Sequence, residues 1–342
     1  MNLNELFERM KKALSPELPV QQPVPIQQPE SKPVSEPESA PEHDEAYDLA
    51  VAKDLTARIM MKTTIQALHM ELTDQVPGIF GSKVGGVPYL PEDAEVPCDA
   101  DGNPLQMLAQ INCTELSALP DFPQEGLLQF WIGQDVSYGL FKDGGARVTY
   151  YPQIDSSVTE DAVRARLASL PKPDESCSPL NGEFGISMAP KFEGLSMQDV
   201  HFEPLFVKMY NEEMPEQKIT EIYDLGDEVG EYLTDANNGF GHKIGGYPGF
   251  TQWDARKEND PRTVLLFQLD SDYGNGTTKV MWGDAGIGAF FCSPEALAAR
   301  DFSDVLYNWD ARCNTPSIIE NGVNKPFSQM LNFTSTPYSS LT

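Results

Sequence analysis

The sequence predicts an α+β protein whose mostly antiparallel sheet is built from two related halves. Short apolar runs rich in aromatic and β-branched residues alternate with turn residues, as in antiparallel strands. They are not separated by regularly spaced helices, as the strands of a parallel sheet would be. A nine-residue motif also occurs twice, which indicates an internal duplication and a pseudo-two-fold body.

The first 45 of the 342 residues differ in composition from the rest of the chain. Residues 15–45 are rich in Pro, Gln and Glu and carry few large side chains, which predicts a disordered, extended linker. Residues 1–14 predict a short amphipathic helix, because five apolar side chains fall on one helical stripe: Leu3, Leu6, Phe7, Met10 and Leu14. A helix this short is marginal alone, so we expect it to dock on a partner, with the linker as its tether. The alternative is that it packs back on its own body.

The folded body is expected to occupy residues 46–342. Its first segment, 46–72, predicts a long helix with a broad apolar face, because two adjoining stripes of apolar side chains follow the helical period. Three shorter helices are also predicted from their capping residues or composition: 162–170 after a capping box that begins at Ser157, 294–300 after the N-cap Ser293, and one within 216–233. Short apolar runs bounded by turn residues predict strands: 106–111, 127–132, 147–151, 264–269, 280–282 and 289–292.

The repeated motif is the strongest pattern in the chain. It reads Phe-Gly-Ser-Lys-Val-Gly-Gly-Val-Pro at 80–88 and Phe-Gly-His-Lys-Ile-Gly-Gly-Tyr-Pro at 240–248, with six of nine positions identical. Each copy follows a Thr-Asp pair and precedes an apolar run that ends in glutamine and an aliphatic residue, and then a strand that runs from an aromatic residue to glycine. This shared order predicts repeat halves at about 73–150 and 234–312.

These residues resemble the YwqG-like family of bacterial proteins. Five further motifs carry the resemblance: L-A-Q-I-N at 108–112, G-L-L-Q-F at 126–130, L-L-F-Q-L-D at 265–270, W-G-D-A-G at 282–286 and D-F-S-D-V-L-Y-N-W-D at 301–310. The resemblance covers roughly residues 60–312. It implies a bacterial intracellular protein with a duplicated α+β fold, and it implies no catalytic residues, because that family has no established activity.

The charge and cysteine content restrict the classes of partner. A formal net charge of −28 opposes binding to nucleic acid or to an anionic membrane surface, since both need clustered Lys and Arg. Five cysteines without a C-x-x-C pair are typical of reduced thiols in a cytoplasmic protein. The sequence shows no signal-peptide pattern and no apolar run of membrane-spanning length. We expect an unknown protein or small-molecule partner and no cofactor.

The candidate binding residues come from the two motifs and the strands that follow them. The Gly-Gly-x-Pro loops could cradle an anion beside a lysine, or they could be tight turns that need glycine. A cleft between the halves would bring the paired residues together. The residues predicted to bind a ligand are Lys83, Gln110, His242, Lys243, Gln268, Trp282 and Asp284. The aromatic residues among them could instead belong to the core.

No metal, nucleotide or catalytic motif is complete. Asp270, Asp272 and Asn275 form a weak candidate cation loop, as do Asp99, Asp101 and Asn103, but hairpin turns use the same residue types. The glycines at 283–288 lack the spacing of a dinucleotide site. His43, His69 and His201 are separate in sequence and do not make a metal set with His242. The sequence therefore predicts a binding protein, with an unrecognised enzyme such as a hydrolase, or an immunity-type protein that neutralises a toxin, as alternatives.

Overall fold

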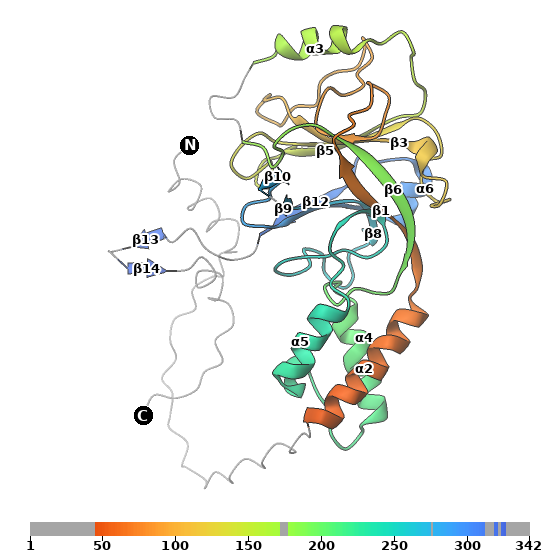
Figure 1. Ribbon diagram of the computed structural model, residues 1–342, viewed down its shortest axis with the longest axis vertical. Helices are drawn as coiled ribbons and strands as arrows, with labels where there is room; N and C mark the ends of the chain where they lie inside the picture. The colour runs from red at the N-terminus through yellow and green to blue at the C-terminus, as the bar shows by residue number, and fades with distance from the viewer. Residues whose placement is uncertain (1–44, 172–176, 275, 312–317, 321–322, 326–342) are drawn as a thin grey trace, which may run out of the picture. The chain divides into compact units, whose positions relative to one another are not determined.

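The computed structural model describes residues 45–171, 177–274, 276–311, 318–320 and 323–325 (Figure 1). The chain divides into two units, Met1–Glu42 and His43–Thr342, and every element described below belongs to the second. The predicted helix at 1–14 and the predicted linker, apart from its last residue, lie outside the described residues.

A ten-stranded antiparallel sheet forms most of the body, as predicted. Its order is β12-β11-β8-β7-β1-β6-β2-β3-β4-β5. The strands are β1 Ile65–Thr73, β2 Lys83–Val84, β3 Gln106–Asn112, β4 Leu127–Ile132, β5 Ala146–Tyr151, β6 Phe184–Glu193, β7 His242–Gly245, β8 Val264–Asp270, β11 Ile287–Cys292 and β12 Leu306–Asp310. Two small hairpins accompany it: β9 Asp272–Gly274 with β10 Thr277–Val280, and β13 Ile318–Glu320 with β14 Val323–Lys325.

The two sides of the sheet are connected crosswise. Strands β2 to β5 lie on one side of the central β1–β6 pair, and β7, β8, β11 and β12 lie on the other. Strand β1 precedes β2 in sequence but is hydrogen bonded to β7, whereas β6 precedes β7 and is bonded to β2. The strand that comes just before β2 in sequence, β1, is therefore paired with the β7 side of the sheet. The strand that comes before β7, β6, is paired with the β2 side.

The sheet curls until it is nearly closed, in a barrel-like form. The rings of Phe130 on β4 and Phe267 on β8 stack with their centroids 4.5 Å apart, although five strands separate β4 from β8 in the sheet. Phe290 on β11 packs against both rings. These aromatic residues are fully buried and form the centre of the main core, so the outer strands β5 and β12 approach each other.

Three helices form a second core. Helices α2, α4 and α5 lie side by side (Figure 1) and bury their own apolar cluster together with the short helix η2. Their bounds are α2 Glu45–Lys62, α4 Phe202–Glu213, η2 Ile222–Leu225 and α5 Asp227–Ala236. The remaining helices are η1 Cys113–Glu115, α3 Glu160–Ala168 and α6 Pro294–Ala299. No helix among the described residues combines the length and the apolar character needed to cross a bilayer.

The helix predicted over 46–72 is wrong in its second part, which is strand β1. The hydroxyl groups of Thr63 and Thr64 donate to the carbonyl groups of Ile59 and Met60, 2.8 and 2.7 Å away, at the end of α2. The following residues are antiparallel to β6 along their whole length. Apolar residues in this segment satisfy both the helical and the strand period, so periodicity alone did not separate the two.

The other predicted elements were mostly confirmed. Helix α6 begins after Ser293, whose hydroxyl accepts a hydrogen bond from the amide of Ala296. Helix α3 was also predicted, but its N-cap is Thr159 and not Ser157. The strand predicted at 280–282 ends at Val280, the helix expected within 216–233 is the η2–α5 pair, and α4 and β6 were not predicted.

Candidate ligand-binding site

The two repeated loops begin from the same strand geometry. Lys83 on β2 lies opposite Gln110 on β3, and Lys243 on β7 lies opposite Gln268 on β8. In both loops the two glycines that follow have positive φ angles, 69° and 74° in the first and 68° and 72° in the second. Residues with a Cβ rarely adopt this conformation, which explains the Gly-Gly pair at the turn.

Gln110 anchors the first loop with its whole amide group. Its Oε1 atom accepts a hydrogen bond from the backbone amide of Tyr89 at 2.8 Å, and its Nε2 atom donates to the carbonyl groups of Ile79 and Gly81 at 2.8 and 3.0 Å. The side chain is completely buried. Gln110 therefore holds the loop against the sheet.

Gln268 anchors the second loop in the same way. Its Oε1 atom accepts a hydrogen bond from the backbone amide of Gly249 at 2.9 Å, and its Nε2 atom donates to the carbonyl groups of Gly239 and Gly241 at 2.9 and 2.8 Å. Each of these partners occupies the same place in its motif as its counterpart around Gln110. The two glutamines thus have the same structural role.

The residue just before each lysine has the same role in both loops, although it is a serine in the first and a histidine in the second. Ser82 Oγ accepts a hydrogen bond from the amide of Asn112 at 2.9 Å, and His242 Nδ1 accepts one from the amide of Asp270 at 3.0 Å. His242 must therefore carry its proton on Nε2, which faces Asp272 at 3.8 Å. Burial lowers the pKa of His242 to about 4, against the opposing effect of Asp272.

We expect acid to destabilise the protein through His242. The unfolded chain takes up a proton at the ordinary pKa of 6.5, whereas the folded chain does so only near 4. The free energy of unfolding should therefore fall as the pH drops from about 6.5 to about 4, by on the order of 2–3 kcal/mol. In His242→Asn the amide oxygen can still accept from Asp270, but nothing titrates there, so this part of the pH dependence should shrink. Urea denaturation between pH 7 and pH 4 measures it, and an equal fall in the variant would contradict the assignment.

The two lysines differ in their partners. Lys243 Nζ lies 2.9 Å from Glu193 Oε1 and 3.0 Å from the carbonyl oxygen of Tyr247. Glu193 also receives hydrogen bonds from His69 and from the amide of Tyr247. Burial alone would raise the pKa of Glu193, but these hydrogen bonds and the charge of Lys243 overcome it and lower the pKa to about 2.

Lys83 has no comparable carboxylate. Its residue is only 2% exposed, and its Nζ atom has one long hydrogen bond, 3.4 Å, to the carbonyl oxygen of Gly78. No carboxylate of the described residues lies within 4.0 Å of it. Burial lowers the pKa of Lys83, and the more distant Glu160 and Glu183 offset this only in part.

The other predicted residues lie apart from the loop anchors. Trp282 is buried in the core against Tyr138 and Trp309, and Asp284 is exposed on the turn before β11. Asp270 Oδ2 accepts a hydrogen bond from the amide of Gly241 at 2.7 Å. The structure brings the predicted residues together in pairs at the two loops, and it does not gather them around one cleft.

Of the two candidate cation loops, the one at Asp99 is a turn stabilised by its own aspartate. Asp99 accepts hydrogen bonds from the amides of Asp101 and Asn103, as a turn-forming aspartate does. Asp272 begins β9, and Asn275 lies outside the described residues. Within the part of the chain that the structure describes, no three His, Cys, Asp or Glu side chains converge as metal ligands would.

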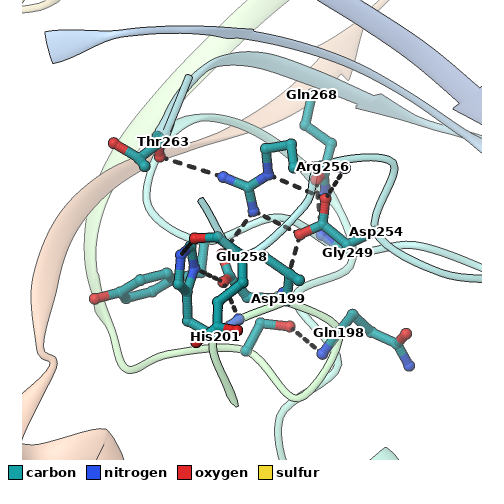
Figure 2. Close-up of polar contacts among 12 residues, drawn as sticks. Gln198, Asp199, His201, Gly249, Asp254, Arg256, Glu258, Thr263 and Gln268 are labelled. Atoms are coloured by element: carbon teal, nitrogen blue, oxygen red, sulfur yellow. Dashed lines mark hydrogen bonds and ion pairs between the residues drawn. The ribbon is translucent and has the colours of Figure 1, made fainter. Parts of the chain in front are cut away.

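A buried ionic cluster around Arg256 was missed by the sequence reading (Figure 2). Arg256 makes a bidentate pair with Asp254, at 3.0 and 2.7 Å, and its NH2 group also lies 2.8 Å from Asp199. Its guanidinium lies over the ring of Phe291, 4.4 Å from the centroid. His201, read as isolated, contacts Asp199 through Nδ1 at 2.7 Å and the carbonyl oxygen of Glu258 through Nε2 at 3.0 Å. Both ring nitrogens are thus engaged, which makes this cluster a structural tie between two loops.

A hollow lies where β5 and β12 approach each other. Its volume is about 530 Å³, and residues from both ends of the sheet line it: Gly144, Ala146, Arg147, Val148, Tyr150, Phe290, Arg300, Asp301, Phe302, Ser303, Val305 and Tyr307. Tyr307 and Trp309 of β12 donate hydrogen bonds to the carbonyl groups of Tyr138 and Ser137, which lie in the loop before β5. These contacts hold the two edges beside each other around the hollow, which we call the seam hollow.

The fold and these loops define a nearly closed antiparallel sheet protein of a family without known activity. The chain belongs to the DUF1963 family, a domain of unknown function, whose family model matches residues 82–311. The match extends from just before β2 to just after β12. It includes the second loop, the first loop from Ser82 onward and the seam hollow, and it excludes α2 and β1. No curated protein matches the chain.

Proposed function

We propose that this protein binds a small ligand in the seam hollow, at the junction between two halves of the chain. The observation that carries the proposal is the lining of the hollow, to which residues 144–150 and 290–307 both contribute. Hollows at the junction of two structural units are common ligand sites. A second hollow, about 550 Å³ around Gly85, Gly86 and Trp131, is lined by residues between Gly85 and Gly182 alone.

The two halves are part of the same proposal, as products of an internal duplication. Its support is the matched set of contacts around Gln110 and Gln268, together with the matched positions of Ser82 and His242 and the crosswise placement of β1 and β6. In a duplicated protein, the surface between the halves can evolve into a site that neither half possesses. The motifs shared with the YwqG-like family support a bacterial origin, and the free cysteines of the described part of the chain support a cytoplasmic location.

Filling the hollow should abolish binding without unfolding the protein. Ser303 is exposed at the hollow, and its hydroxyl group is hydrogen bonded to the exposed carboxylate of Asp301. Ser303→Trp gives up this exposed contact and places an indole ring at the hollow. Saturation-transfer NMR with phenyl phosphate, benzoate, benzyl alcohol and benzylamine should show at least one probe binding to the wild type. That signal should be lost in Ser303→Trp and kept in Ser187→Trp, a control on the exposed face of β6. Binding of no probe, or equal binding to both variants, would reject the proposed site.

A further inference from the structure

We infer that the ligand of the seam hollow is an anion that carries an aromatic ring, held by Arg147 and Arg300; this inference rests on the proposed function. The chain has 52 acidic and 24 basic residues, so two arginines at one hollow are an exception to its overall charge. The inference follows from how these two guanidinium groups are placed and from what surrounds them.

Neither arginine is neutralised by a carboxylate of the described residues. Arg300 donates hydrogen bonds to the carbonyl oxygens of Leu297, Asp121 and Phe122, at 2.7, 2.5 and 3.1 Å. Carbonyl groups fix the orientation of the guanidinium but leave its charge uncompensated. Arg147 is exposed, and its guanidinium has no hydrogen bond or ion pair within the described part of the chain. Guanidinium groups in this state are suited to carboxylate or phosphate.

The backbone of Arg300 gives an independent indication. Arg300 follows helix α6 in the left-handed conformation, with φ 57° and ψ 29°. Glycine is the usual residue at such a helix end, since other residues are strained there by about 1 kcal/mol or more. Keeping arginine at a position that favours glycine implies a task for its side chain. Its hydrogen bonds to Leu297, Asp121 and Phe122 are one such task, and a charge fixed by them beside the hollow would be a second.

The rest of the lining is suited to a ring. Tyr150 and Phe302 meet edge to face at 6.1 Å, and Phe290 and Tyr307 stack at 4.8 Å. Asp301 also lines the hollow, and its carboxylate accepts a hydrogen bond from the amide of Ser303 at 3.0 Å. Two arginines against one aspartate leave a net positive hollow in a strongly negative protein, so an aromatic carboxylate or an aryl phosphate is the class of ligand that fits.

Calorimetric titration of the full chain with a matched set of probes tests the inference. Phenyl phosphate or benzoate should bind at least tenfold more tightly than benzyl alcohol or benzylamine, and inorganic phosphate should bind more weakly than phenyl phosphate. The ratio of phenyl phosphate to benzoate then tells which anion the site prefers. Arg147→Gln should weaken binding of the preferred anion at least tenfold and leave benzyl alcohol unaffected. Arg164→Gln, which removes another exposed arginine, paired with Glu160 on α3 and outside the hollow, should change nothing.

Arg300→Gly separates the role of the side chain from folding. Glycine suits the left-handed backbone, but it also removes the hydrogen bonds to Leu297, Asp121 and Phe122. We therefore expect the protein to stay folded with a melting temperature that changes by only a few degrees, while anion binding falls at least tenfold. If the neutral or cationic probe binds as tightly as the anions, or if both arginine variants keep full affinity, the anion inference is wrong although the hollow is still a ligand site. If no probe binds to the wild type, the proposed function itself fails.

Discussion

Replacing Lys243 with methionine is expected to lower the free energy of unfolding by about 3–5 kcal/mol. Methionine fills the space of the aliphatic stem but leaves Glu193, whose side chain is only 10% exposed, without its charged partner. Glu193 keeps its hydrogen bonds from His69 and from the amide of Tyr247, but it loses the positive charge that helps to offset its desolvation. The pKa of Glu193 should rise from about 2, because the charge of Lys243 helps to lower it.

Lys83→Met is the matched control, since Lys83 occupies the same motif position and is equally buried. Its ammonium group has one long hydrogen bond and no carboxylate within ion-pair distance, so removing the charge removes a desolvation cost. We expect the stability to stay within about 1 kcal/mol of the wild type or to rise. Urea denaturation of both variants measures the difference. Equal losses in the two variants would show that the ion pair with Glu193 does not distinguish the loops.

Arg256→Met should be at least as destabilising, with an expected loss of about 3–5 kcal/mol. The change leaves Asp199 and Asp254 buried together, each side chain 4% exposed, without the guanidinium that separates their charges. It also removes the contact with the ring of Phe291. Because the cluster joins the loop before α4 to the loop after β7, we expect the three-helix part to loosen first in hydrogen exchange.

The chain offers a close control for this prediction. Arg262 pairs with Asp260 at the same spacing, with the same bidentate geometry at 2.9 and 2.8 Å, but its side chain is 25% exposed. Arg262→Met should cost less than about 1 kcal/mol, as a solvent-accessible pair does. Thermal unfolding of the two variants compares a buried bidentate pair with an exposed pair of the same geometry, and so measures how much the burial contributes to stability. A similar loss in both would mean that the bidentate contact, and not its burial, determines the effect.

The sequence identified which residues recur in the two loops, but it did not show what their side chains do. Lys83 and Lys243 were expected near each other or in symmetric positions, with Gln110 and Gln268 beside them. The structure places each lysine opposite the glutamine of its own loop, on paired strands. A sequence shows which residues recur, but not whether an amide group faces a ligand or the backbone of its own loop. Here both glutamines use all their hydrogen-bonding groups on the loop.

Other features depend on distant residues that no local pattern reveals. Asp254 and Arg256 are near in sequence, but Asp199 is separated from them by the segment that contains α4 and α5. Strand β6 was missed because six of its ten residues are more polar or exposed than a central strand usually is, and it contains Pro190. The seam hollow requires both ends of the sheet, so it exists only once the sheet has curled.

The crosswise exchange of β1 and β6 has a consequence for the order in which the chain can assemble. Both edges of β1 are completed by segments made much later, residues 184–193 and 242–245. During synthesis, β2 therefore cannot pair with β6, and β1 cannot pair with β6 or β7, until those later segments have been made. Such dependence on remote partners slows folding. It also means that cutting the chain between β5 and β6 would separate neighbouring strands of the sheet: β2 would lack β6 in the first fragment, and β7 would lack β1 in the second.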